Sequence, residues 1–316
     1  MSRKSSAKRQ HYVPRLLLKR FTDKNTVWVF DKWENKTFKS SITGVAAENY
    51  YYDYEIDGVV GSFEDMLTNY ESKASRIINR IVENQSIHRL TNEDRYVLSE
   101  FIAIQYLRTP FAFDQMLNFH DRLMEELFLR GIKPENIEGY EEPDENLYKL
   151  LRLSQLSDFK VFAQSFYNKT WLLQSTSNNL KFWISDNPIS FQNLNKKEER
   201  GGIGLEVDGI EVYLPLSKEL TLALWCSSTT KFITKSYKLI ENDKDLARQL
   251  PEQHSSIKLM YDCINNGKLL ELTDANVTNL NSLQVKYSTR FIFSYDNDFT
   301  LAKEMIKDVP QYRKQR

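Results

Sequence analysis

The stretch RQHYVPR, which begins at Arg9, places one of the four histidines of the chain among basic residues. An imidazole titrates near neutral pH, so His11 has the chemistry of a general base, a general acid or a metal ligand. The positive charges of Arg9 and Arg15 should lower its pKa and favour the neutral form. Pro14 fixes its own φ and restricts Val13 to an extended backbone, which predicts a stiff arm carrying the imidazole. The alternative is a structural histidine, hydrogen-bonded beneath a short turn.

A second candidate group lies in the stretch FIAIQYLRTP, which begins at Phe101. On a helix, Gln105 and Arg108 follow Phe101 at i+4 and i+7, so all three share one face. A guanidinium is suited to bidentate binding of a phosphate or a carboxylate, which predicts a cleft-lining pair that binds substrate. Glu64 and Glu71 are seven residues apart on another predicted helix and lie on one side of it. They are candidate catalytic or metal-binding carboxylates, a solvated stripe, or the partner of Arg108 in an internal salt bridge.

The third candidate is the sequence Ser185-Asp186-Asn187-Pro188, which follows a predicted strand. A strand end fixes the backbone while the following turn exposes the side chains, so Asp186 is a candidate catalytic carboxylate and Asn187 a candidate substrate ligand. The same four residues also form a good turn, because Asp and Asn cap neighbouring N–H groups and Pro prevents further pairing. Both interpretations remain open at this point.

Apolar spacing and capping residues predict the helices that position these groups. Phe63, Leu67, Tyr70 and Ala74 recur at helical intervals, which predicts a helix over 62–84 with Ser62 as N-cap. Thr91 and Asp94 form a capping-box pattern for a helix over 91–108. Thr109 followed by Pro110 predicts the start of a third helix, which ends at Gly131. Further helices are expected over 147–167, 243–266 and 299–307.

Short β-branched and aromatic runs predict strands in the rest of the chain. Residues 27–31 and 36–40 suit a hairpin. Five runs between 169 and 227 read as short strands in one mainly antiparallel sheet, and RFIFS (290–294) reads as a late strand. The fold class is therefore α+β, a single large domain in which a helical middle segment packs on a mainly antiparallel sheet. We expect a flexible basic segment over 1–9, the domain over 10–295 and a C-terminal helix with a basic tail over 296–316, with 133–146 an exposed acidic loop.

Composition excludes several classes of protein. The chain has 316 residues, with Lys+Arg and Asp+Glu both 43, so no overall field favours nucleic acid or a membrane. The N-terminal segment is locally basic, because Arg3, Lys4, Lys8, Arg9, Arg15, Lys19 and Arg20 precede the first acid, Asp23. Two cysteines in a chain of this length indicate a reducing compartment, and the absence of a long apolar run argues against a membrane span. We expect a cytoplasmic protein.

The chain resembles a bacterial family known as domain of unknown function 4238. The resemblance depends on HYVPR, the strand that begins at Val27, FIAIQYLRTP, WISDNP and the Pro215-Leu216-Ser217 sequence, which occur in this order. It extends from about residue 10 to 295 and so implies one domain. It implies no established activity.

Two functional hypotheses follow from the residues. In the first, His11, Glu64 and Asp186 are catalytic, and Arg15, Gln105, Arg108 and Asn187 bind the substrate in one polar cleft. The enzyme would be a nuclease or another hydrolase of phosphate-containing substrates, with Mg²⁺ or Mn²⁺ on the carboxylates and nucleic acid as the partner. The lack of a metabolic signature favours a toxin or phage-defence role. In the second hypothesis, the polar motifs are structural and the protein is a non-catalytic module that binds nucleic acid or protein.

Overall fold

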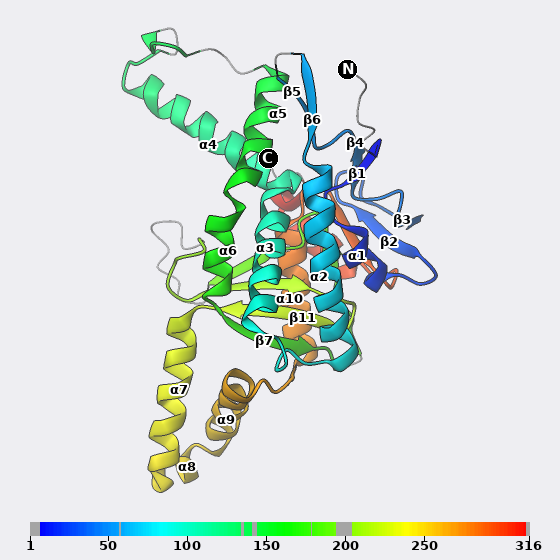
Figure 1. Ribbon diagram of the computed structural model, residues 1–316. Coiled ribbons are helices and arrows are strands. Elements are labelled where there is room, and N and C mark those ends of the chain that lie inside the picture. Colours follow the sequence, from blue (N-terminus) through cyan, green and yellow to red (C-terminus); the bar gives the residue numbers. More distant parts are fainter. Residues whose placement is uncertain are drawn as a thin grey trace.

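The computed structural model describes residues 7–56, 58–133, 136–140, 144–177, 179–193 and 204–313. Its centre is the helix α3 (Asn92–Leu107), which packs against α2 (Glu64–Asn84) on one side and α6 (Phe159–Tyr167) on another (Figure 1). The residues of α3 from Leu98 to Gln105 are all buried. A helix that is enclosed on every side fixes the few polar side chains it carries, so α3 is the element that positions the central part of the candidate site.

The helical middle segment begins and ends largely as its sequence predicts. Thr91 and Asp94 form the expected capping box of α3, and the Thr109 hydroxyl accepts from the N–H of Ala112 at the start of α4 (Pro110–Leu129). The observed N-cap of α2 is Phe63, one residue after the expected Ser62. The expected helix over 147–167 is interrupted. It consists of α5 (Glu145–Ser154), a 3₁₀ turn η3 (Gln155–Asp158) and α6.

The N-terminal part of the chain forms short strands around the first helical turns. The elements are β1 (Arg9–His11), α1 (Arg15–Leu18), η1 (Lys19–Phe21), β2 (Thr26–Asp31), β3 (Lys36–Ser41), β4 (Ala47–Asn49), β5 (Asp53–Ile56) and β6 (Val59–Ser62). The strands β2 and β3 form the predicted antiparallel hairpin. The strand β1 pairs antiparallel with β4, and this pairing holds the segment that contains His11 against the body of the protein.

The strands form two main sheets, so the expectation of a single sheet over 170–226 is wrong. One sheet has the order β12-β7-β11-β10-β9, and the other has the order β3-β2-β13-β8. The elements are β7 (Thr170–Ser175), β8 (Ile184–Ser185), β9 (Ser190–Asn193), β10 (Ile210–Pro215), β11 (Leu220–Trp225), β12 (Leu270–Glu271) and β13 (Phe291–Ser294). The strand β8 joins the second sheet because its partner is β13, more than a hundred residues later in the chain. All pairings in both sheets are antiparallel except that of β12 with β7.

Both faces of the five-stranded sheet are covered. Every residue of β10 and β11 is buried, which is the pattern of a strand with packing on both sides. The main core lies between this sheet and the central helices. A smaller cluster around Phe30, Trp183 and Phe299 packs α11 (Thr300–Asp308) against the second sheet. The molecule is therefore a single α+β domain with a helical middle segment.

The C-terminal half differs from its sequence prediction in two places. The expected helix over 243–266 is preceded by a long helix, α7 (Ser227–Asn242), and is divided into α8 (Lys244–Gln249) and α9 (Pro251–Asn266). The helix α10 (Asp274–Tyr287) was not expected, and the predicted strand at 205–209 is a turn. The last element is the 3₁₀ turn η4 (Pro310–Arg313). The helices α7 to α9 project from one end of the molecule and α4 projects from the other (Figure 1).

Parts of two expectations lie outside the described residues. The flexible segment over 1–9 is described only from residue 7, and the acidic loop over 133–146 lacks residues 134–135 and 141–143. Among the residues that the structure describes, no helix has the length and apolar character that crossing a membrane requires.

Candidate functional site

His11 is the last residue of β1, and its imidazole lies against the chain that follows β3. Nε2 is 3.1 Å from the carbonyl oxygen of Ile42. A carbonyl only accepts, so Nε2 carries the proton in this contact and Nδ1 of the neutral ring keeps its lone pair. Burial lowers the pKa of His11 below 6.5, the Ile42 hydrogen bond opposes this, and the charge of Arg15 lowers the pKa further. The expected direction is confirmed, with burial as the larger cause.

Tyr52 fixes the backbone on which His11 is carried. Its hydroxyl donates to the carbonyl of His11 at 3.0 Å, and its backbone N–H donates to Oε1 of Gln10 at 2.6 Å. The amide nitrogen of Gln10 donates in turn to Oδ1 of Asp53 at 2.8 Å. Gln10 is fully buried. The polar residue next to His11 in the chain is therefore a structural anchor, and the imidazole has a fixed position.

Arg108 is buried and makes hydrogen bonds along its whole guanidinium group. Nη1 lies 2.7 Å from Oε1 of Glu71, and Nε and Nη2 donate to Oε1 of Gln105 at 2.9 and 2.7 Å. Gln105 donates from its Nε2 to the carbonyl of Tyr12 at 3.0 Å. Of the two interpretations of Arg108, the structure shows the internal salt bridge, and its partner is Glu71. The side chain of Arg108 has no exposed surface, so it positions Glu71 and the N-terminal segment.

Glu64 is the first residue of α2 and lies at the opening of this network. Burial raises the pKa of its carboxyl to about 7, the negative charge of Glu71 raises it further, and the charge of Arg108 opposes both. Glu71 also acts on His11, whose pKa it raises. A carboxylic acid that titrates near 7 can exchange a proton at neutral pH, which an ordinary glutamate cannot do efficiently. Glu64 and His11 are both half-buried.

Arg15 is a charged residue that acts on His11 from the protein surface. It is exposed at the start of α1, and its charge contributes to the lowered pKa of His11. Three of the expected site residues are linked by electrostatic effects: Arg15 and Glu71 act on His11, and Glu71 and Arg108 act on Glu64. Arg108 is buried and its partner Glu71 is half-buried. This group of five residues is called the HEER cluster below.

Asp186 lies in a different environment from the HEER cluster. It follows β8, as its sequence predicts, but its side chain turns inward and is 1% exposed. Oδ1 accepts from the N–H of Thr289 at 2.8 Å, and Oδ2 accepts from those of Arg290 and Phe291 at 2.6 and 2.7 Å. Burial raises the pKa of Asp186, while these hydrogen bonds and the charge of Lys32 lower it. The carboxylate connects β8 to the start of β13.

Asn187 joins two of the sequence motifs through buried hydrogen bonds. Its Oδ1 accepts from the hydroxyl of Thr109 at 3.2 Å, and its Nδ2 donates to the carbonyl of Tyr287 at 3.2 Å. Like Asp186, it is 1% exposed. The HYVPR, QYLRTP and SDNP stretches therefore do converge, but the contacts between them lie in the interior.

Lys32 is a buried ionisable residue that the sequence motifs did not indicate. Its Nζ donates to the carbonyls of Val285 and Ser288 at 3.0 and 2.5 Å, at the C-terminal end of α10. Burial lowers its pKa to about 8, and the charge of Asp186 opposes this. An ammonium at a helix C-terminus interacts favourably with the helix dipole, so we assign Lys32 to the structure of this region.

The carboxylates were also candidates for metal binding. Over the described parts of the chain, no three or more His, Cys, Asp or Glu side chains lie close enough together to hold a metal ion. Three residues at this site were not among the residues of the predicted polar cleft. Glu71 belongs to the HEER cluster, and Tyr52 and Gln10 hold the backbone at His11. Glu71 was visible as the i+7 partner of Glu64, whereas the roles of Tyr52 and Gln10 depend on pairings that no local pattern shows.

Comparison with known proteins gives a match to one described family. The model of the family described as "Protein of unknown function (DUF4238)" matches residues 9–298. No curated protein and no solved structure matches the chain. The matched span includes the HEER cluster, Asp186 and Asn187, and it agrees with the range that the sequence motifs indicated.

Proposed function

This chain belongs to the DUF4238 family, whose description gives no activity, and we propose that it is a ribonuclease that uses His11 and Glu64 as a base and an acid. The observation that carries the proposal is the HEER cluster. It combines a half-buried histidine held neutral, a half-buried carboxyl that titrates at about 7, and one exposed arginine. A histidine that is neutral at pH 7 can accept a proton, and a carboxyl with a pKa of about 7 can donate one, so the two groups can serve as a base and an acid.

Cleavage of RNA needs only the groups that this cluster supplies. Nδ1 of His11 takes the proton from a ribose 2′-hydroxyl, and the resulting oxygen attacks the adjacent phosphorus. The bond from phosphorus to the 5′-oxygen breaks, and the protonated carboxyl of Glu64 gives its proton to that leaving oxygen. Arg15 neutralises charge on the phosphate oxygens. The products are a 2′,3′-cyclic phosphate and a free 5′-hydroxyl, so atoms and charge balance without a further reactant.

The salt bridge between buried Arg108 and half-buried Glu71 has a positioning role in this proposal. Arg108 is held by Glu71 and Gln105 and has no exposed side-chain surface, so it does not contact the substrate. It holds the charge of Glu71 near both reacting groups. That charge raises both pKa values and, together with burial, keeps a large fraction of Glu64 protonated at neutral pH.

The alternative is a binding module in which the polar motifs are structural. The hydrogen bonds of Asp186, Asn187 and Gln105 favour a structural role for these three residues, because all of them are buried. The hydrogen bond of His11 to the carbonyl of Ile42 is compatible with either interpretation. The half-buried carboxyl of Glu64 is left unexplained by the alternative. A carboxyl whose pKa is raised to about 7 makes the folded protein less stable at neutral pH than an ordinary carboxyl would. Proteins retain such destabilising groups at functional sites.

The test is incubation of the purified protein with a single-stranded RNA and a DNA of the same sequence, in the presence of EDTA. We expect cleavage of the RNA alone, with 2′,3′-cyclic phosphate ends. Cleavage of both polymers in EDTA would show that the 2′-hydroxyl is not the nucleophile, which contradicts the proposed mechanism. Cleavage only when Mg²⁺ or Mn²⁺ is added in excess of EDTA would instead support a metal-dependent nuclease. No cleavage under any of these conditions would support the binding module.

Matched variants connect any activity to the cluster. His11→Ala and Glu64→Gln should each lower the cleavage rate by about 100-fold or more, which is the usual size of a general acid or base contribution. His88→Ala and Glu83→Gln are the controls. His88 is exposed, and Glu83 is exposed on the same helix as Glu64. A loss of activity in the controls would indicate contamination or unfolding.

A further inference from the structure

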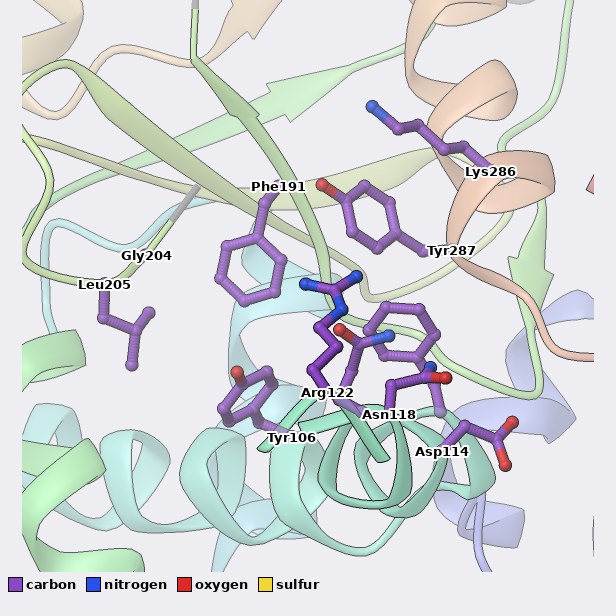
Figure 2. A pocket seen from close by; sticks show the side chains of 11 residues that line it. Tyr106, Asp114, Asn118, Arg122, Phe191, Gly204, Leu205, Lys286 and Tyr287 are labelled. Carbon is purple, nitrogen blue, oxygen red and sulfur yellow. The ribbon is translucent and has the colours of Figure 1, made fainter. Parts of the chain in front are cut away.

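A second candidate site lies beside α4, on a different side of α3 from the HEER cluster. It is a pocket of about 440 Å³ between α4, α3, β9 and α10 (Figure 2). Tyr106 contributes to its wall from α3. Successive residues on a helix are rotated by about 100°, so Tyr106 points away from the directions of Gln105 and Arg108. The volume is within the usual range for sites of small organic ligands, roughly 300–1,000 Å³.

Aromatic rings from four different elements form the wall of this pocket. The ring centroids of Tyr106 and Phe191 are 5.5 Å apart, those of Phe191 and Tyr287 are 5.8 Å apart, and those of Phe111 and Tyr287 are 5.6 Å apart. These pairs pack edge to face. A wall of this kind offers ring faces and edges to a planar ligand, because bases stack on aromatic side chains in proteins that bind single-stranded nucleic acid.

The hydroxyl of Tyr287 lies in this wall without a hydrogen-bond partner. Tyr287 is 5% exposed, and its oxygen is buried and has no partner among the residues that the structure describes. Figure 2 shows the ring reaching from α10 toward Phe191, with the hydroxyl at its far end. Burial raises the pKa of Tyr287, so the phenol stays neutral and able to donate. A buried hydroxyl with no partner destabilises the fold, and a ligand with a polar edge would satisfy it.

Two basic side chains stand at the same pocket. Arg122 extends from α4, and in the view of Figure 2 its guanidinium points toward the middle of the pocket, between the rings of Phe191 and Tyr287. Within the described ranges of the chain, Arg122 makes no ion pair or hydrogen bond. Lys286 lies with its Nζ 5.6 Å from the ring centre of Tyr287. The carboxylate of Asp114 also lines the pocket, so the basic groups exceed the acidic ones by one.

We propose that this pocket binds a nucleotide. The base would stack against the aromatic wall, the Tyr287 hydroxyl would bond to a polar edge of the base, and Arg122 and Lys286 would contact the phosphate. Gln115 and Asn118 add amide groups that can both donate to and accept from a base edge. The ligand chemistry is a planar heteroaromatic ring with an anionic group. It can come from a free nucleotide or from one unstacked nucleotide of a strand.

The experiment measures binding of deoxyadenosine 5′-monophosphate to the full chain by calorimetry. A deoxynucleotide lacks the 2′-hydroxyl, so it is not a substrate for the ribonuclease proposed above, and the two proposals can fail separately. Deoxyadenosine and deoxyribose 5-phosphate test the two halves of the ligand. We expect the complete nucleotide to bind more tightly than either half. A hexamer of deoxyadenylate that binds more tightly than the monomer would identify a strand as the source, and the reverse would identify the free nucleotide.

Two variants distinguish a site from a surface that happens to be concave. Tyr287→Phe should weaken nucleotide binding about fivefold, the equivalent of one hydrogen bond, while the melting temperature stays the same or rises because an unsatisfied hydroxyl is removed. Arg122→Gln should weaken binding of the nucleotide and leave that of deoxyadenosine unchanged. Arg130→Gln, whose side chain is exposed farther along the same helix segment, is the control. Absence of binding at millimolar nucleotide, or binding that neither variant weakens, would overturn the proposal.

Discussion

Oε1 of Glu71 lies 2.7 Å from Nη1 of Arg108, and the same carboxylate raises the pKa values of His11 and Glu64. A buried cation thus holds in place a negative charge that acts on two titrating groups. Arg108 is fully enclosed by α3 and its neighbours, so the position of this charge depends on the core and is not adjusted by the solvent. The predictions that concern pH follow from this relationship.

The cleavage rate should have a bell-shaped dependence on pH. His11 acts as a base only above its pKa, which burial holds below 6.5, and Glu64 acts as an acid only below its pKa of about 7. The product of the two fractions is greatest between these values. The measurement is kcat/KM for RNA cleavage from pH 4.5 to 9. A rate that rises continuously to pH 9 would show that Glu64 is not the acid.

Glu71→Gln should move the whole pH profile toward lower pH. The negative charge of Glu71 raises the pKa of Glu64 and of His11, so its removal lowers both. Glutamine keeps a hydrogen-bond acceptor for Arg108, which limits the loss of stability. The two apparent pKa values from the profile are the measurement. If both limbs stay in place while the rate falls, Glu71 has no electrostatic role and only supports the structure.

Glu64→Gln should change the pH dependence of stability, whether or not the protein is an enzyme. The folded-state pKa of about 7 is above the ordinary value of 4.5, so the folded protein binds this proton more tightly than the unfolded chain does. Wild-type protein should therefore lose stability relative to the glutamine variant as pH rises from about 4.5 through 7. Chemical unfolding of both proteins at several pH values measures this difference. A constant difference across this range would show that the carboxyl has an ordinary pKa.

Asp186→Asn should destabilise the fold and is not expected to act through catalysis. The carboxylate accepts three backbone N–H groups, and an asparagine would turn its own NH₂ toward at least one of them. Leaving one buried donor unsatisfied costs about 1–3 kcal/mol. The free energy of unfolding in urea is the measurement, and Asp245→Asn, at an exposed carboxylate, is the control. An unchanged unfolding free energy together with lost activity would return Asp186 to the list of catalytic candidates.

Deletion of residues 2–7 should weaken the salt dependence of RNA binding. The deletion removes Arg3 and Lys4 and keeps Lys8 and Arg9, which precede or belong to β1. Each phosphate contact contributes about 0.7 to the slope of log affinity against log salt for a single strand, so the slope should fall by about 1.4. Binding is measured on uncleaved RNA with the His11→Ala variant. An unchanged slope would show that the N-terminal basic residues do not contact the strand.

Local sequence signals determined the helical middle segment and the hairpin. The capping box of Thr91 and Asp94, Thr109 before Pro110, and the apolar spacing of α2 are each satisfied by residues a few positions apart. These signals act through hydrogen bonds and packing within one element, so they can be recognised without knowledge of the rest of the chain. The motif residues themselves, from His11 to Asn187, were also identified from sequence.

The tertiary structure decided which of those residues face a solvent-accessible site. Asp186 and Asn187 lie at a strand end as expected, but their partners are Thr289, Tyr287 and Thr109, which are about a hundred or more residues away in two cases and 78 in the third. Whether a carboxylate turns outward or accepts buried N–H groups depends on which segment the fold brings to it. The strand β8 entered the sheet of β13 for the same reason, since strand pairing is a non-local choice. The sequence therefore determined the candidates, and the packing of distant segments decided which of them are buried and which are half-buried. The reason is that these distant contacts set the burial of each group and the electric field around it.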